Sequence, residues 1–248
     1  MDAPDMFYCV DQPTNTTTAY EGRCAMLSGG MVWNLFDEFR FTVPDCRKLF
    51  IDSGGFQATD RWDMSYPYEP KELFDWAESI NADYVAAPDF ACEPELHETS
   101  VEHRIERTIE EHAYAFHQYR EGDYSFQLLP VLQGYYEDQY EWCVERYKEE
   151  GFIRDYMAVG TVCKRDSTDA IHNVMETIDR NLPDVDFHMF GMTLNAWKDR
   201  RMWGRFRSAD TAAWSWGGQT QAHKVELLNE YAEKVDSIRN EITEQATL

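Results

Sequence analysis

The chain has 248 residues, 43% of them hydrophobic and 15% aromatic, so it can bury one large core. Its apolar runs are too short to span a membrane, and its acidic start matches no targeting segment. We therefore expect a cytoplasmic protein without a membrane partner. Acidic residues outnumber basic ones by 46 to 23, and the formal net charge of -23 ordinarily excludes a nucleic-acid partner.

So negative a charge also suits a salt-rich cytoplasm, where dense carboxylates hold water and ions screen their mutual repulsion. We favour such a halophilic source over a merely acidic protein. In that setting the acidity of the chain does not exclude a nucleic-acid partner.

Short β-prone runs alternate with longer amphipathic stretches, which is typical of parallel strands covered by helices. In chain order, strands are predicted over 6–10, 48–52, 83–89, 125–133, 156–162, 186–192 and 204–210, with a loop over 11–22. Helices are predicted over 69–80, 95–119, 136–151 and 166–182, with a closing helix over about 220–245.

About seven or eight such units close a barrel, whereas an open doubly wound sheet usually has fewer units and a phosphate-binding loop after its first strand. The chain contains no GxGxxG or Walker motif. We therefore predict an α/β fold, a (β/α)8 TIM barrel that forms a single domain over residues 1–248.

Polar residues follow the predicted strands at the edge where barrel enzymes build their sites. The stretch LFIDSGGFQA (49–58) ends a strand in Asp52 and continues with two glycines that permit close backbone approach to a ligand. Later strands end in Asp89, Gln133 and Asp210. Each aspartate alone is equally well explained as a helix cap. Three carboxylates and an amide at one mouth indicate a binding site.

The motifs DSGGFQ, LQGYYEDQYEWCVERYKEEGF, AVGTVCKR and FGM resemble, in order and spacing, those of the tRNA-guanine transglycosylase superfamily. The resemblance runs from about Lys48 to Trp216. The compact length, GTVCKR and SADTAAW are most similar to the branch that modifies DNA, the deazapurine DNA modification family (DNA 7-deazaguanine transglycosylases).

Members of that superfamily are TIM barrels related to queuosine and archaeosine chemistry. The resemblance implies a pentosyltransferase that replaces guanine in DNA with a 7-deazaguanine base, such as 7-cyano-7-deazaguanine, through a covalent Asp–sugar intermediate. It also implies a viral or archaeal source, and the host cytoplasm as location if the source is viral.

By resemblance, Asp210 is the nucleophile and Asp52 is the general acid–base. Retaining exchange at an anomeric carbon needs a carboxylate on one face of the sugar and a proton donor near the departing base. Burial beside the two glycines and Phe56 would raise the pKa of Asp52 and suit it to this task. Asp199 is the fallback for the nucleophile.

The resemblance also assigns residues to the base. These are Ser53, Phe56, Asp89, Gln133, Gly160, Thr161, Phe190 and Gly191. Carboxylate and amide groups suit the edge of guanine, and two aromatic rings suit its faces. Plain core packing is the alternative for both phenylalanines. The target nucleotide must be flipped or single-stranded, because its anomeric carbon is inaccessible in a stacked duplex.

Basic residues gather in WKDRRMWGRFR (197–207) and at the end of a neighbouring strand. We expect contacts to DNA phosphates from Lys164, Arg165, Lys198, Arg200, Arg201, Arg205 and Arg207. A network of these residues with surface acids is the alternative. Trp203, Trp214 and Trp216 are candidates for base stacking, with core packing as the competing interpretation.

The chain departs from the tRNA enzymes in several respects. No cysteine follows Cys163, so the zinc-binding insertion is absent, and we expect no metal and no cofactor. Tyr135 replaces a glycine beside the base edge. A tRNA-guanine transglycosylase, a non-catalytic barrel that binds a deazapurine or nucleic acid, and a glycosidase-like hydrolase stay open as alternatives. A partner protein that opens the duplex is a further expectation.

Overall fold

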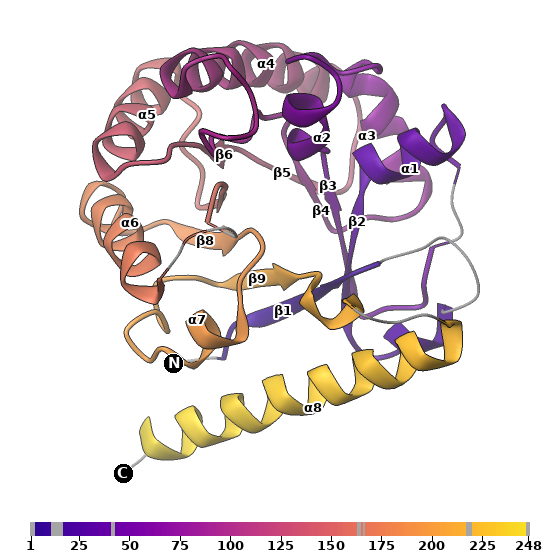
Figure 1. Cartoon of the computed structure of the whole chain (residues 1–248). Helices are drawn as coiled ribbons and strands as arrows, with labels where there is room; N and C mark the ends of the chain where they lie inside the picture. The colour runs from indigo at the N-terminus through magenta and orange to yellow at the C-terminus, as the bar shows by residue number, and fades with distance from the viewer. Residues whose placement is uncertain are drawn as a thin grey trace.

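The computed structural model describes residues 3–10, 17–40, 43–162, 165, 167–216 and 220–246. Its strands are β1 Asp5–Cys9, β2 Cys24–Ser28, β3 Lys48–Asp52, β4 Tyr84–Ala86, β5 Gln127–Leu129, β6 Val131–Leu132, β7 Tyr156–Val159, β8 Asp186–Met189 and β9 Ser208–Thr211. They form one parallel sheet in the order β5-β4-β3-β2-β1-β9-β8-β7-β6 (Figure 1).

The two ends of this sheet meet at Pro130, the only residue between β5 and β6. β5 pairs with β4 and β6 pairs with β7, so one proline-interrupted segment completes the ring. Proline has no N–H to donate, which explains the interruption, but its carbonyl still accepts from the N–H of Ala158 at 2.8 Å. The predicted (β/α)8 TIM barrel is therefore confirmed, with nine strands that fill eight strand positions.

Helices lie between the strands on the outside of the ring (Figure 1). They are α1 Gly29–Phe36, α2 Gly55–Asp60, α3 Pro70–Ser79, α4 Val101–Glu121, α5 Glu137–Glu150, α6 Thr168–Asn181, α7 Leu194–Lys198 and α8 Gln221–Ala246, with short 3-10 helices η1 Thr17–Tyr20 and η2 Ala213–Ser215. The long α8 packs against η1, η2 and α7. Among the helices described, none is long and apolar enough to cross a bilayer.

Besides the two 3-10 helices, four elements were not predicted: β2, α1, α2 and α7. The β2 sequence, CAMLS, has no β-branched or aromatic residue, yet its backbone pairs with β1 on one side and β3 on the other. The predicted strand over 204–210 begins only at Ser208. Of the predicted loop over 11–22, positions 11–16 lie outside the described residues and 17–20 form η1.

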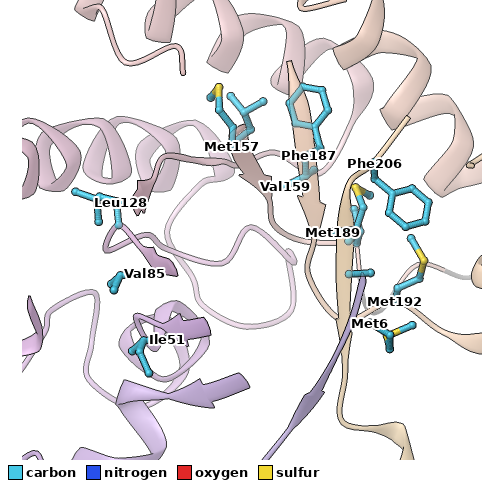
Figure 2. Close-up of a cluster of buried hydrophobic side chains, with 14 of the residues drawn as sticks. Met6, Ile51, Val85, Leu128, Met157, Val159, Phe187, Met189, Met192 and Phe206 are labelled. Carbon is cyan, nitrogen blue, oxygen red and sulfur yellow. The ribbon is translucent and has the colours of Figure 1, made fainter. Parts of the chain in front are cut away.

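Side chains alternate along each strand between the outer layer and the barrel interior. On β3, Leu49 and Ile51 pack outward into the main core, whereas Phe50 joins a separate interior cluster. On β7, Met157 and Val159 belong to the outer layer with Phe187 of β8 (Figure 2). The same alternation sends every second residue of each strand toward the axis of the barrel.

Candidate active site

A cavity of about 360 Å³ opens at the carboxyl ends of the strands, a size typical of small-molecule sites. It is lined by Cys9, Val10, Met26, Ser28, Met31, Asp52, Gly55, Phe56, Gln57, Asp89, Ala91, Glu93, Gln133, Gly160, Thr161, Phe190, Gly191, Asp210, Ala212 and Ser215. The structure thus brings both expected catalytic aspartates and all the expected base-contacting residues except Ser53 to one cavity. Ser53 is fully buried just behind it.

The two glycines after β3 permit a close approach that no larger residue would allow. Gly54 has φ 92°, and a Cβ there would lie 2.7 Å from the Cα of Gly30. A Cβ on Gly55 would lie 2.5 Å from Oδ1 of Asp89. The Gly-Gly pair therefore allows α2 to begin directly against α1 and against the Asp89 carboxyl group.

Asp52 is the last residue of β3 and points into the cavity. Burial raises the pKa of its carboxyl group from 3.8 to about 6, and the charge of Asp210 acts in the same direction. Hydrogen bonds from Ser28 and from the backbone of Gly54 oppose the rise. A carboxyl group with such a pKa can both give and take a proton near neutral pH.

Asp89 lies in the loop after β4 and is 6% exposed. The Ser53 hydroxyl donates to its Oδ1 at 3.0 Å, and the Gln133 amide donates to its Oδ2. Burial, reinforced by the charge of Asp52, raises the pKa of Asp89 to about 7 in spite of these hydrogen bonds. Ser53 thus contacts the carboxylate rather than the cavity.

Gln133 links Asp89 to the strand β7 side of the cavity. Its Oε1 accepts from the Thr161 hydroxyl at 2.7 Å. A Cβ on Gly160 would lie 2.2 Å from Nε2 of Gln133, so the absence of a side chain at Gly160 makes room for the Gln133 amide. Thr161 has a positive φ of 54°, a conformation that is costly for a β-branched residue. This strained turn places the threonine hydroxyl on Gln133.

Asp210, the third residue of β9, is 5% exposed and is held on both carboxylate oxygens. The N–H of Gly191 donates to Oδ1 at 2.8 Å, and the thiol of Cys9 donates to Oδ2 at 3.2 Å. His188 Nε2 lies 3.3 Å from Oδ1. The carboxylate is therefore fixed in orientation while it still lines the cavity.

His188 extends this network down the barrel axis. Its Nδ1 lies 2.6 Å from the Ser208 hydroxyl, which in turn lies 2.5 Å from the Tyr156 hydroxyl. Burial lowers the pKa of His188, so the ring is neutral near pH 7. The network then assigns a proton to Nε2, donated to Asp210, while Nδ1 accepts from Ser208.

Two aromatic side chains complete the cavity. Phe56 at the start of α2 is 37% exposed at the mouth. Phe190 packs edge-on against His188, with 4.9 Å between ring centroids. Cys9, Met26 and Ser28 also line the cavity and were not expected. Cys9 ends β1, so the strand-end rule could have found it, whereas Met26 and Ser28 belong to the strand that the sequence did not reveal.

The basic residues do not form one cluster at the mouth. Lys164 lies outside the described residues, and Arg165 donates to the carbonyl of Tyr135 at 2.7 Å. Lys198 is the last residue of α7 and Arg200 follows two residues later, and both side chains are exposed. Arg201 pairs with Asp199 and, at 2.7 Å, with Asp169 in the first turn of α6. Asp199, the fallback nucleophile, does not line the cavity.

Arg205 and Arg207 lie away from the mouth. Arg207 precedes β9, stacks over the Tyr156 ring at 4.7 Å and lies 3.8 Å from Asp186. Tyr156 and Asp186 are the first residues of their strands, so Arg207 is at the amino-terminal end of the barrel. Arg205 lies 3.8 Å from Asp179, near the end of α6. The structure therefore does not bring these two arginines to the site. Residues 205–207 precede β9 and lie at the amino-terminal end of the barrel, whereas the cavity is at the carboxyl end.

The cavity of this parallel barrel combines an anchored carboxylate, a second carboxyl group titrating near neutral pH and a set of amide and aromatic groups, which are the groups that glycosyl transfer by a pentosyltransferase requires. A family model described as DpdA, DeoxyPurine in DNA protein A, matches residues 34–227. The chain therefore belongs to this family of DNA 7-deazaguanine transglycosylases, and its substrate is guanine in DNA. The comparison with curated proteins found no match.

Proposed function

We propose that the enzyme exchanges guanine in DNA for 7-cyano-7-deazaguanine through a covalent bond between Asp210 and the deoxyribose. The observation that carries this proposal is that Asp52 and Asp210 line one cavity but have different surroundings. Asp210 is oriented by three neighbouring groups, while burial raises the pKa of Asp52 to about 6. One group suits nucleophilic attack and the other suits proton transfer.

In the first step, a carboxylate oxygen of Asp210 attacks C1′ of the target nucleotide. The bond from C1′ to N9 breaks, and its electron pair leaves with the base. Asp52, in its acid form, gives its proton to this base, so guanine departs neutral and Asp52 becomes a carboxylate.

In the second step, the Asp52 carboxylate removes the N9 proton of the incoming base. N9 forms the new bond to C1′, and the ester bond to Asp210 breaks with its electron pair returning to the carboxylate. Asp52 ends protonated and Asp210 ends ionised, so both groups are ready for another cycle. Two displacements at C1′ retain its configuration.

Base recognition follows from the same cavity. Ionised Asp89 accepts from the N–H and amino groups of guanine, and the second amide hydrogen of Gln133 is suited to the base carbonyl. Phe56 and Phe190 supply apolar contacts to the ring faces. Guanine and 7-deazaguanine share this edge, so one site serves both bases in turn. Gly160 and Gly191 shape the site by occupying little space.

Phosphate contacts are proposed for the basic residues other than the two at the amino-terminal end of the barrel. We assign them to Lys164, Arg165, Lys198, Arg200 and Arg201 and do not retain Arg205 and Arg207 for this role. Contacts of this kind position the backbone without reading sequence. A partner protein that opens the duplex is the alternative to base flipping by the enzyme itself.

The test is base exchange with radiolabelled guanine or 7-cyano-7-deazaguanine, offered DNA or unmodified tRNA, in about 2 M KCl, a salt level chosen from the acidity of the chain. We expect label in DNA with the wild type and a loss of at least about a thousandfold with Asp210→Ala, as for other catalytic nucleophiles. Asp199→Ala is the matched control and should keep its activity. Denaturing electrophoresis should show a protein–DNA adduct only where Asp210 is present.

Label in tRNA alone would replace the proposal with a tRNA enzyme, and label in neither would favour a binding protein. Exchange that persists in Asp210→Ala would overturn the covalent mechanism while leaving the family activity intact.

A further inference from the structure

Trp216 is the most exposed large hydrophobic side chain in the described part of the chain, with 78% of its surface accessible. The other two tryptophans singled out from the sequence differ: Trp203 is 8% exposed and Trp214 is 5% exposed, and both belong to the core. Leaving an indole ring in water forgoes one of the largest gains from burial that a side chain offers. A ring left exposed beside a binding site is therefore a candidate contact surface.

Trp216 is at the rim of the catalytic cavity. It directly follows η2, and Ser215 and Ala212 both line the cavity in which Asp210 lies. Consecutive Cα atoms are about 3.8 Å apart, so the backbone of Trp216 is one residue from the cavity wall. A nucleotide whose sugar reaches Asp210 has its neighbouring bases at the mouth of the cavity, and Trp216 directly follows one part of the cavity wall.

The rim is firmly anchored. The indole N–H of Trp214 donates to the carbonyl of Cys9 at 3.1 Å, and its ring packs edge-on against Tyr20. The hydroxyl of Ser215 donates to the carbonyl of Ala212 at 2.9 Å. The residue before Trp216 is thus held by hydrogen bonds, and the large ring two residues before it is buried.

A flipped nucleotide leaves a gap in the stack of a duplex, and DNA-binding proteins commonly fill such gaps with an apolar wedge. We propose that Trp216 inserts into the DNA base stack at the place vacated by the target guanine, so that the enzyme acts on duplex DNA. This inference rests on the proposed function, because it needs a target sugar at Asp210. Contacts to phosphate weaken with salt, whereas stacking needs no charged group on the protein. Stacking therefore suits a chain of net charge -23 better than added phosphate contacts.

The test compares exchange of labelled guanine into three versions of one oligodeoxynucleotide: the duplex, the single strand, and a duplex in which the target guanine faces an abasic site. We expect Trp216→Ala to slow exchange in the duplex roughly tenfold more than in the single strand, because a wedge offsets part of the unstacking cost. The abasic duplex should recover most of the loss. Trp216→Phe should keep an intermediate rate, and Tyr114→Ala, which removes an exposed ring from α4, is the matched control.

Equal slowing of duplex and single strand by Trp216→Ala would overturn the wedge, as would a wild-type enzyme that acts on single strands only. Failure of the wild type to exchange guanine into any of the three substrates would instead count against the proposed function.

Discussion

Asp52 and Asp89 are carboxyl groups whose folded environment resists ionisation. Burial raises the pKa of Asp52 from 3.8 to about 6 and that of Asp89 from 3.8 to about 7. The folded protein therefore binds these protons more tightly than the unfolded chain does. It follows that the free energy of unfolding falls as the pH rises from about 4 to about 7. Near neutral pH, these two carboxyl groups therefore lower the stability of the folded protein.

Asp52→Asn should consequently stabilise the protein while it abolishes proton transfer. At pH 8 we expect a gain of up to about 3 kcal/mol, since each pKa unit corresponds to about 1.4 kcal/mol. The gain should vanish at about pH 2, where Asp52 is protonated in both states. Thermal unfolding of the variant and the wild type between those pH values measures the difference.

Asp75→Asn provides the control of opposite sign. Lys71 lowers the pKa of exposed Asp75, so this variant should lose a little stability at pH 8 and none at low pH. A difference in stability between Asp52→Asn and the wild type that is the same at every pH would contradict this expectation.

Most residues of the site that the sequence revealed lie at the carboxyl ends of strands or within a few residues after them. Asp52, Gln133 and Gly160 were found in this way, and strand alternation then explains why Asp52 and Asp210 face the cavity. Met31 and Glu93 line the same cavity from an unpredicted helix and from a loop, where no period marks the inward face. Their positions depend on tertiary packing, which the local pattern does not encode.

At the scale of elements, the junction of β3 and α2 decides how closely Asp89 approaches the site. Gly55→Ala places a methyl group 2.5 Å from Oδ1 of Asp89, closer than van der Waals contact allows. We expect the carboxylate to move by a few tenths of an ångström or more and the KM for the incoming base to rise about tenfold to a hundredfold, as for other misplaced site groups. Steady-state exchange with varied 7-cyano-7-deazaguanine measures this change.

Gly151→Ala separates this effect from a general loss of stability. Gly151 caps α5 at φ 72° with no atom within 4 Å of the added methyl group, so its replacement strains the backbone far from the cavity. The control should unfold at a lower temperature and keep its KM. An unchanged KM in Gly55→Ala would show that Asp89 tolerates displacement.

The elements that the sequence missed are those whose existence depends on neighbours. β2 has weak strand propensity and is stabilised by two flanking strands, and α2 and α7 are only six and five residues long. Helices this short are marginal in isolation. The long, periodic α4, α5 and α6 were predicted to within a few residues at most boundaries because each carries a full apolar stripe of its own.

At the scale of the whole molecule, the net charge of -23 sets how stability depends on salt. Repulsion among exposed carboxylates destabilises the compact state, and ions screen it. We expect the Tm to rise steadily as KCl increases from about 0.1 M to about 2 M. Differential scanning calorimetry in KCl and in matched sucrose separates charge screening from general solute exclusion, and a Tm independent of KCl would refute the expectation.

The segment that closes the barrel is also the one that delivers Gln133. β6 has only two residues, it begins immediately after Pro130, and Gln133 follows it directly. Leu129, Val131 and Leu132 are nevertheless fully buried, and core strands of this kind open only when the whole protein unfolds. The contact between Gln133 and Asp89 should therefore persist until the barrel itself unfolds. Loss of activity on heating and loss of structure should then coincide.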